Sequence, residues 1–213
     1  MDEEISIINN ETKKEKVLNF FKNNKKKLFL LLIILILIPF SIFSYQIIKD
    51  KNKDKLSSKF NLAVSSYENG NKSEIKSIMK EIIYNKDKTY SPLALYFLID
   101  NDIQLTNEEV NNYFDIIINE INLDKEIKNL NIYKKGLFNS SFASENEILT
   151  ILKPILNSES IWKPHALILL GEYFIDKNQN QKATEFFNQI LLIENANEKL
   201  KKEARKRLIS ISG

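Results

Sequence analysis

Very few side chains in this sequence could carry out chemistry. His165 is the only histidine and no cysteine is present, so Ser–His–Asp arrangements, thiol chemistry and His- or Cys-based metal sites have almost nothing to use. Glu108 and Glu109 are adjacent carboxylates, but they fall in the first turn of a predicted helix, where acidic residues complement the helix dipole. The sequence also lacks a glycine-rich phosphate-binding motif. We therefore predict that the protein is not an enzyme, with no catalytic residues, no cofactor and no metal site.

Two neighbouring aromatic residues, Trp162 and His165, are the remaining candidates for contact with a ligand. Trp162 could stack on a ligand, although packing between neighbouring helices is the commoner use of such a residue. His165 stands at the predicted start of a helix, and we interpret it as a surface or helix-start residue. The sequence assigns no binding residue.

One segment places whatever the protein does at a membrane. Residues 28–48 contain no charged side chain, and Leu28 through Ile38 are all Leu, Ile or Phe. A helix of this length spans about 30 Å, the thickness of the hydrocarbon core of a bilayer. Pro39 does not argue against this interpretation, because membrane helices tolerate proline. We predict a single transmembrane helix at residues 28–48.

The alternative interpretation of this segment is a cleaved signal peptide. Such peptides have a shorter apolar run followed by small residues at the cleavage site. Ser41 and Ser44 could supply the small residues, but Ile42 and Phe43 interrupt them and the apolar run continues to Ile48. A retained anchor is therefore the preferred prediction.

Lysine distribution predicts the orientation of the anchor. Seven lysines precede the span, and Lys25, Lys26 and Lys27 abut it directly, while five follow it up to Lys59. An excess of basic residues marks the cytoplasmic side of a span. We thus expect a cytoplasmic tail at residues 1–27 and a periplasmic domain at residues 49–213, anchored in a bacterial inner membrane.

The predicted extramembrane domain is almost neutral. Residues 49–213 hold 24 basic and 23 acidic residues. Binding of nucleic acid requires a clustered basic face, which these interleaved charges do not suggest. We predict no nucleic-acid partner.

Residues 49–213 read as successive helices. They hold few glycines and prolines, and apolar residues recur at helical spacing. Start signals accompany them: Thr106 with Glu109 and Ser144 with Glu147 match capping boxes, and Asn71 is a weaker cap. Ser91 before Pro92 predicts another helix start. The apolar stripes are Val110, Tyr113, Phe114, Ile117 and Ile121; Leu167, Leu170, Gly171 and Phe174; Ala183, Phe186, Phe187 and Ile190; and Leu200, Ala204, Leu208 and Ile211.

The spacing of the helices predicts a repeat. The second helices of four hairpins are expected to begin near Lys72, Asn107, Glu145 and Gln181, at intervals in the mid-thirties. Two helices per unit at this period are typical of tetratricopeptide-type repeats. The predicted fold is all-α: a single N-terminal transmembrane helix, then a degenerate tetratricopeptide-like α-solenoid of about four helical hairpins with a C-terminal capping helix.

The last predicted repeat follows the tetratricopeptide pattern best. It has Gly171 where its two helices should meet, Phe174 three residues later, Ala183 facing Gly171, and Phe187 beyond. The first repeat keeps Leu62, Ala63, Gly70, Ile75 and Met79, while the middle repeats, around Ala94 and Gly136, are degenerate. The helix that enters the first repeat is expected to become amphipathic, with its apolar face at Phe60, Leu62, Ala63, Val64 and Tyr67.

With its lysine-containing tail, single anchor and one well-formed repeat near the end, the chain resembles the YfgM-like family of bacterial inner-membrane proteins. Residues 161–191 carry the local resemblance, through Trp162, Ala166, Gly171, Ala183 and Phe187. The family includes an ancillary subunit of the Sec translocon. The resemblance implies contacts with the translocon and with periplasmic chaperones.

Two classes of function remain open. The preferred hypothesis is a membrane-anchored protein–protein interaction module, accessory to the Sec translocon or to periplasmic chaperones. The alternative is a structural or oligomerising scaffold subunit of an envelope or cell-division complex. Self-association is compatible with both.

Overall fold

A computed structural model describes residues 2–68 and 70–212 of the chain. The side chains at positions 2–14, 17, 28, 42, 45, 49 and 212 are outside this description, and so are Lys13, Lys14 and Lys49 of the orientation prediction. Helices and the turns between them make up the described residues, which contain no strand. The prediction of an all-helical protein is confirmed.

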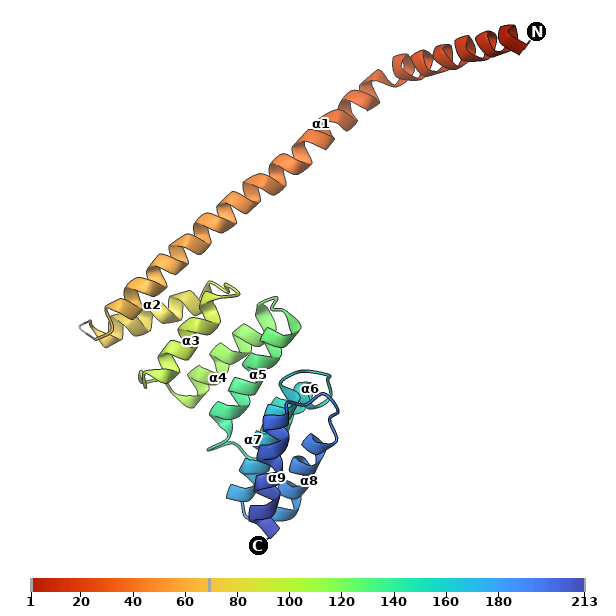
Figure 1. The fold of residues 1–213 in the computed structure, drawn as a ribbon. Coiled ribbons are helices and arrows are strands. Elements are labelled where there is room, and N and C mark those ends of the chain that lie inside the picture. The colour runs from red at the N-terminus through yellow and green to blue at the C-terminus, as the bar shows by residue number, and fades with distance from the viewer. Residues whose placement is uncertain (1, 69, 213) are drawn as a thin grey trace. The chain divides into compact units, whose positions relative to one another are not determined.

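The first helix, α1 (Asp2–Ser65), contains the predicted membrane span (Figure 1). Its segment Phe29–Ser65 is, within the described part of the chain, the one helical stretch long and apolar enough to cross a membrane. The most apolar window of this stretch has a mean hydropathy of 2.5, and none of its residues is buried. Pro39 lies inside the helix, as expected.

Contacts divide the chain into two compact units, Met1–Lys55 and Leu56–Gly213. Hydropathy alone predicts the boundary at residues 48 and 49, where the apolar run ends. The second unit instead starts at the first side chain that packs on its core, the half-buried Leu56. The polar residues in between belong by contact to the first unit.

The second unit is a succession of helices that follow one another from yellow to blue in Figure 1. After α1 they are α2 (Lys72–Tyr84), α3 (Tyr90–Asp100), α4 (Asn107–Asp115) with the π-helical turn η1 (Ile116–Glu120), α5 (Lys125–Asn139), α6 (Glu145–Leu156), α7 (Lys163–Asp176), α8 (Asn180–Leu191) and α9 (Glu198–Ser212). In chain order, we group the helices of the described residues into four successive pairs and a final helix. Pair 1 is residues 56–65 of α1 with α2, pair 2 is α3 with α4–η1, pair 3 is α5 with α6, and pair 4 is α7 with α8.

The predicted starts of the second helices are correct to within one residue. They begin at Lys72, Asn107, Glu145 and Asn180. Each of the first three has the side-chain cap that the sequence indicates. Asn71 accepts a hydrogen bond from the Ser73 backbone N–H, and both capping boxes are complete.

The predicted start of α3 is wrong. Asp87, not Ser91, caps this helix, because its carboxylate accepts the backbone N–H groups of Thr89 and Tyr90, each at 2.8 Å. Ser91 lies inside the helix, fully buried, and donates its hydroxyl to the Ile82 carbonyl at 2.9 Å. The hydroxyl therefore joins α3 to α2 instead of starting α3.

The four second helices bury the same positions. In each, the residues three, seven and ten places after the first helical residue are at most 3% exposed. We call these twelve residues the shared stripe: Ile75, Met79 and Ile82; Val110, Phe114 and Ile117; Ile148, Leu152 and Ile155; Ala183, Phe187 and Ile190. This repetition indicates that the four second helices pack on their neighbouring helices in the same register.

The first helices meet the shared stripe at corresponding positions. An ideal Cβ built on Gly136 would lie 2.6 Å from Leu152 Cδ2, and one built on Gly171 would lie 2.6 Å from Phe187 Cε1. In both pairs the partner is sixteen residues after the glycine. The sequence predicts Ala183 opposite Gly171, but the Phe187 ring takes that place.

Pair 1 begins with the last turns of α1. Ala63 is buried, and Phe60 packs against Tyr90 and Phe97 of α3 with ring centroids 5.9 and 6.4 Å away. Leu62, which we expected on the buried face, is 67% exposed instead. Val64 is exposed as well. Only one side of α1 packs on the domain. The residues adjacent to Ala63 in the sequence lie on other sides of the helix and point away from the core.

Candidate protein-binding surface

Contacts between residues about one repeat apart join consecutive first helices. Tyr96 of α3 donates its hydroxyl to Asn131 Oδ1 of α5 at 2.7 Å, across 35 residues. Tyr133 of α5 stacks on Trp162, at the start of α7, with centroids 5.7 Å apart and an interplanar angle of 22°. Arg207 of α9 contacts Glu172 of α7 at 2.5 Å, again across 35 residues. The helices α3, α5, α7 and α9 therefore form one continuous layer.

Three aliphatic side chains are exposed at or just before the starts of α3, α5 and α7, which belong to this layer. Leu93 near the start of α3, Ile127 near the start of α5 and Ile161 just before α7 are 40%, 44% and 68% exposed. They are 34 residues apart, close to the repeat spacing. We call these three residues the apolar rim.

Hydrogen bonds place the members of the apolar rim side by side. The Ile161 N–H donates to Glu126 Oε2 at 3.3 Å, directly next to Ile127. Ser160 donates its hydroxyl to the same carboxylate oxygen at 2.7 Å. Leu93 and Ile127 each lie about one turn before the Tyr96–Asn131 hydrogen bond that links their helices. These bonds bring the segments that carry the three exposed aliphatic side chains next to one another.

A cavity of about 720 Å³ opens at the α7 end of the apolar rim. It lies between the α6–α7 connection, the α8–α9 connection and Leu200 of α9. Ile161, Trp162 and His165 line it from one side, and Ile193 and Ala196 line it from the other. The rim and the cavity together form an apolar surface that contains one large aromatic residue.

Trp162 belongs both to the packing between repeats and to this cavity. Its ring is half-buried, stacks on Tyr133, and lies 5.2 Å from the His165 ring. Burial raises the pKa of Tyr133 above its ordinary value. The two uses of Trp162 that the sequence leaves open are compatible, because one face of the ring packs on α5 while the residue still lines the cavity.

His165 is less exposed than its interpretation as a surface or helix-start residue implies. It stands near the start of α7, but it is half-buried between Trp162 and Tyr133, and its Nδ1 atom is buried without a hydrogen-bond partner. No sequence pattern described above predicts a role for Tyr133, Leu93 or Ile127 at this surface. Only the 34-residue spacing of exposed aliphatic residues could have pointed to the last two.

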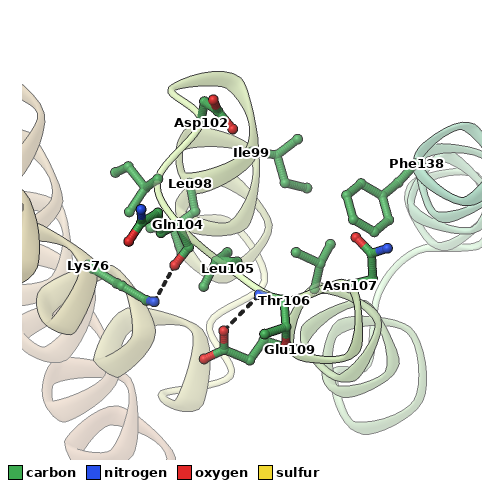
Figure 2. Close-up of a pocket in the computed structure, with 12 residues that line it drawn as sticks. Lys76, Leu98, Ile99, Asp102, Gln104, Leu105, Thr106, Asn107, Glu109 and Phe138 are labelled. Atoms are coloured by element: carbon green, nitrogen blue, oxygen red, sulfur yellow. Dashed lines mark hydrogen bonds between the residues drawn. The ribbon is translucent and has the colours of Figure 1, made fainter.

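Figure 2 shows a second cavity, of about 530 Å³, around the connection between α3 and α4. Lys76 donates to the Gln104 carbonyl there, and Glu109 accepts the Thr106 N–H at 3.0 Å. Glu109 also contacts Lys80 at 2.6 Å, and this hydrogen bond holds the pKa of the Glu109 carboxyl below its ordinary value. These side chains already hold the connection together, so we assign this cavity a structural role.

The adjacent carboxylates of Glu108 and Glu109 are not used as a pair. Glu109 completes a capping box, whereas Glu108 stands exposed in the first turn of α4. Among the side chains that the structure describes, no group of three or more His, Asp or Glu residues could hold a metal ion.

Comparison of the chain with protein-family models, with curated proteins and with solved structures finds no match.

Proposed function

We propose that this protein is a membrane-anchored protein–protein interaction module without enzymatic activity. Its four helical pairs are tetratricopeptide-like repeats closed by α9, and its binding surface is the apolar rim with the adjoining cavity. One observation carries the proposal: exposed aliphatic residues recur at the repeat spacing and lead into a cavity lined by Trp162. Exposed apolar patches on protein surfaces mark interaction sites.

An extended or helical apolar segment of another protein is the ligand that fits this surface. The rim offers three aliphatic contacts, and the cavity offers room for a bulky side chain against Trp162. Trp is strongly enriched among residues that dominate binding energy. The stacking on Tyr133 holds the Trp162 ring before a ligand arrives, which reduces the entropic cost of binding.

The resemblance to the YfgM-like family supports the Sec translocon or periplasmic chaperones as the partners, at the bacterial inner membrane. In this proposal residues 28–48 cross the membrane, residues 1–27 are cytoplasmic and the helical domain is periplasmic. The anchor raises the local concentration of the domain beside a membrane-embedded partner.

Site-specific photocrosslinking in bacterial cells tests the binding surface. A photoreactive amino acid in place of Ile161 of the full chain should give an adduct with a translocon subunit or a chaperone, identified by mass spectrometry. Lys153, which is exposed on α6, is the matched control position. Ile127→Asp, an exposed change in the rim, should abolish the adduct. Equal adducts from positions 161 and 153 would refute the surface, and adducts mainly with other copies of this chain would favour the scaffold alternative.

Reporter fusions test the orientation. A reporter that works only in the periplasm should be active when fused after Gly213, a position outside the described residues. Activity of a cytoplasmic reporter at that position, with none from the periplasmic one, would reverse the proposed topology.

A further inference from the structure

The last helix has a charge unlike that of the domain it belongs to. Residues 56–197 hold 14 basic and 19 acidic residues, a net charge of −5, whereas α9 holds six basic and two acidic residues, a net charge of +4. Fifteen residues of α9 thus reverse the sign of the charge at one end of the domain.

The positive charges of α9 fall into two groups. Lys201 and Arg207 are half-buried and paired, Lys201 with Glu198 at 3.5 Å and Arg207 with Glu172 at 2.5 Å. The other four are exposed, and the structure records no ion pair or hydrogen bond for their side chains among the described residues. They are Lys199, Lys202, Arg205 and Lys206.

These four side chains share one face of α9 with an exposed aliphatic residue. Their positions recur three and four residues apart, so they follow one side of the helix. Ile209, which is 75% exposed, continues the same side by one more turn. The opposite side, which includes the fully buried Ala204, packs on α7 and α8. We call the four cations and Ile209 the basic face.

A helix that only covers the end of a repeat array needs a polar outer side, and charges of mixed sign serve that purpose. Elsewhere in the domain most surface lysines alternate with acids or pair with them, as Lys86 does with Glu120 and Lys182 with Glu145. The basic face has cations of one sign beside an aliphatic side chain. That combination fits an anionic surface with an apolar interior beneath it.

We infer that the basic face of α9 binds anionic phospholipid headgroups, with Ile209 inserted at the edge of the acyl region. This inference rests on the membrane anchoring proposed above, because the anchor keeps a bilayer within reach of the domain. Clusters of Lys and Arg side chains beside a bilayer are attracted by the negative surface potential of anionic lipids. Each Lys or Arg at an anionic surface raises occupancy about fivefold, so four cations supply roughly several hundredfold.

A labelled full-length chain in lipid vesicles tests the inference. Because the sequence has no cysteine, Ser210→Cys adds a single labelling position, and residue 210 is exposed next to Ile209. The probe is an environment-sensitive fluorophore on Cys at that position. The vesicles contain phosphatidylcholine alone or phosphatidylcholine mixed with phosphatidylglycerol.

We expect a blue shift of the fluorophore in the phosphatidylglycerol vesicles and none in phosphatidylcholine vesicles. Molar salt, which shortens the Debye length to about 3 Å, should reverse the shift. Changing Lys199, Lys202, Arg205 and Lys206 together to Gln should abolish it. The matched control changes four other exposed lysines to Gln, with the same loss of charge, and should keep the shift: Lys88, Lys125, Lys128 and Lys153.

Vesicle flotation separates this inference from the anchoring on which it rests. If the chain floats with both kinds of vesicle and the fluorophore shows no shift, the inference is overturned and the anchor stands. Flotation with phosphatidylglycerol vesicles only, together with the shift, supports the basic face and refutes the anchor. A shift that the control variant also loses, or one that depends on protein concentration in phosphatidylcholine, points to nonspecific charge or to a second copy and overturns the inference.

Discussion

Pairs 2 and 4 have the same two-helix architecture, but different residues occupy the position where their two helices meet. In pair 4, Gly171 on the first helix lets the Phe187 ring lie directly on its backbone. In pair 2, the corresponding positions are Leu98 and Phe114, and both side chains are fully buried. A leucine side chain thus stands where pair 4 has none. The comparison indicates that the shared stripe sets the register of every pair, whereas the residue sixteen positions earlier sets how closely the two helices approach.

Pairs 1 and 3 resemble pair 4, because each has a small residue on its first helix. Pair 3 has Gly136 against Leu152, and pair 1 has Ala63 and Met79 at the same two positions. The bulk of the two residues therefore differs from pair to pair while the register stays the same. Because protein interiors are closely packed, we infer that the two helices of pair 2, with large side chains at both positions, lie further apart at this point than those of the other pairs.

Truncation of the Phe187 side chain should have the largest effect on the stability of the domain. Phe187→Ala removes a fully buried ring whose neighbour is glycine backbone, so few atoms can move into the space. We expect a loss of about 3–5 kcal/mol of unfolding free energy. Phe114→Ala should cost less, because Leu98 at the corresponding position offers a side chain that can relax. Chemical denaturation of residues 50–213 measures both, and equal losses would remove the distinction between pairs 2 and 4.

Enlargement of the first stripe position in pair 4 should have the next largest effect. Ala183 occupies a position that holds Ile75, Val110 and Ile148 in the other pairs, and it is fully buried. Ala183→Leu should therefore overpack pair 4 and cost about 1–3 kcal/mol. Ile148→Leu in pair 3 conserves volume and is the control, with a cost below about 1.5 kcal/mol. A melting temperature unchanged by Ala183→Leu would show that the register of α8 is wrong.

Acid should affect pairs 2 and 3 before pair 4. Hydrogen bonds from Lys80 and the Thr106 N–H lower the pKa of Glu109, and those from the Ser144 hydroxyl and N–H lower the pKa of Glu147. A lowered folded-state pKa stabilises the fold above the unfolded value, about 4.3, and this contribution is lost as the pH falls through the folded value. The N-cap residue of α8, Gln179, makes no side-chain hydrogen bond there.

Hydrogen exchange measures this difference by segment. As the pH falls below the ordinary glutamate pKa of about 4.3, amides at the starts of α4 and α6 should lose protection before those of α8. Glu109→Gln and Glu147→Gln should remove the pH dependence at their own helices. Simultaneous loss of protection in all three helices would contradict the assignment.

Loss of an exposed ion pair should have the smallest effect. Lys182 contacts Glu145 at 2.6 Å between pairs 3 and 4, but both side chains are more than a third exposed. We expect Lys182→Ala to change the unfolding free energy by less than about 1 kcal/mol. Lys80→Ala should cost more, because the Lys80–Glu109 pair is less exposed and supports a capping box. A larger effect for Lys182 than for Lys80, in thermal unfolding, would reverse this ranking.

Patterns along the chain predicted the helices well because each signal is local. Thr106 and Ser144 identify their own helix starts, and the stripe of α8 from Ala183 to Ile190 can be read from spacing alone. The prediction for Ser91 is wrong because a carboxylate four residues earlier, Asp87, accepts the N–H groups of Thr89 and Tyr90, so the helix begins before Ser91.

Features that depend on contacts between pairs could not be predicted. The partner of Gly171 depends on the rotation of α8 about its own axis, which decides between Ala183 and Phe187. The exposure of Ile127 and Ile161 depends on which sides of α5 and α7 their neighbours leave open. The candidate surface could for this reason not be predicted from the sequence, although the sequence identifies Trp162 as a candidate for contact with a ligand.

A double-mutant cycle in pair 4 tests the shared register most directly. Gly171→Ala alone should cost about 1–3 kcal/mol, because its Cβ meets the Phe187 ring. In a Phe187→Met background, pair 4 acquires the combination that pair 1 has in Ala63 and Met79, and Gly171→Ala should then cost less than about 0.5 kcal/mol or stabilise through its better helix propensity. A coupling energy of at least about 1 kcal/mol between the two changes, measured by denaturation of residues 50–213, is the predicted result. Additivity within about 0.5 kcal/mol would contradict the account.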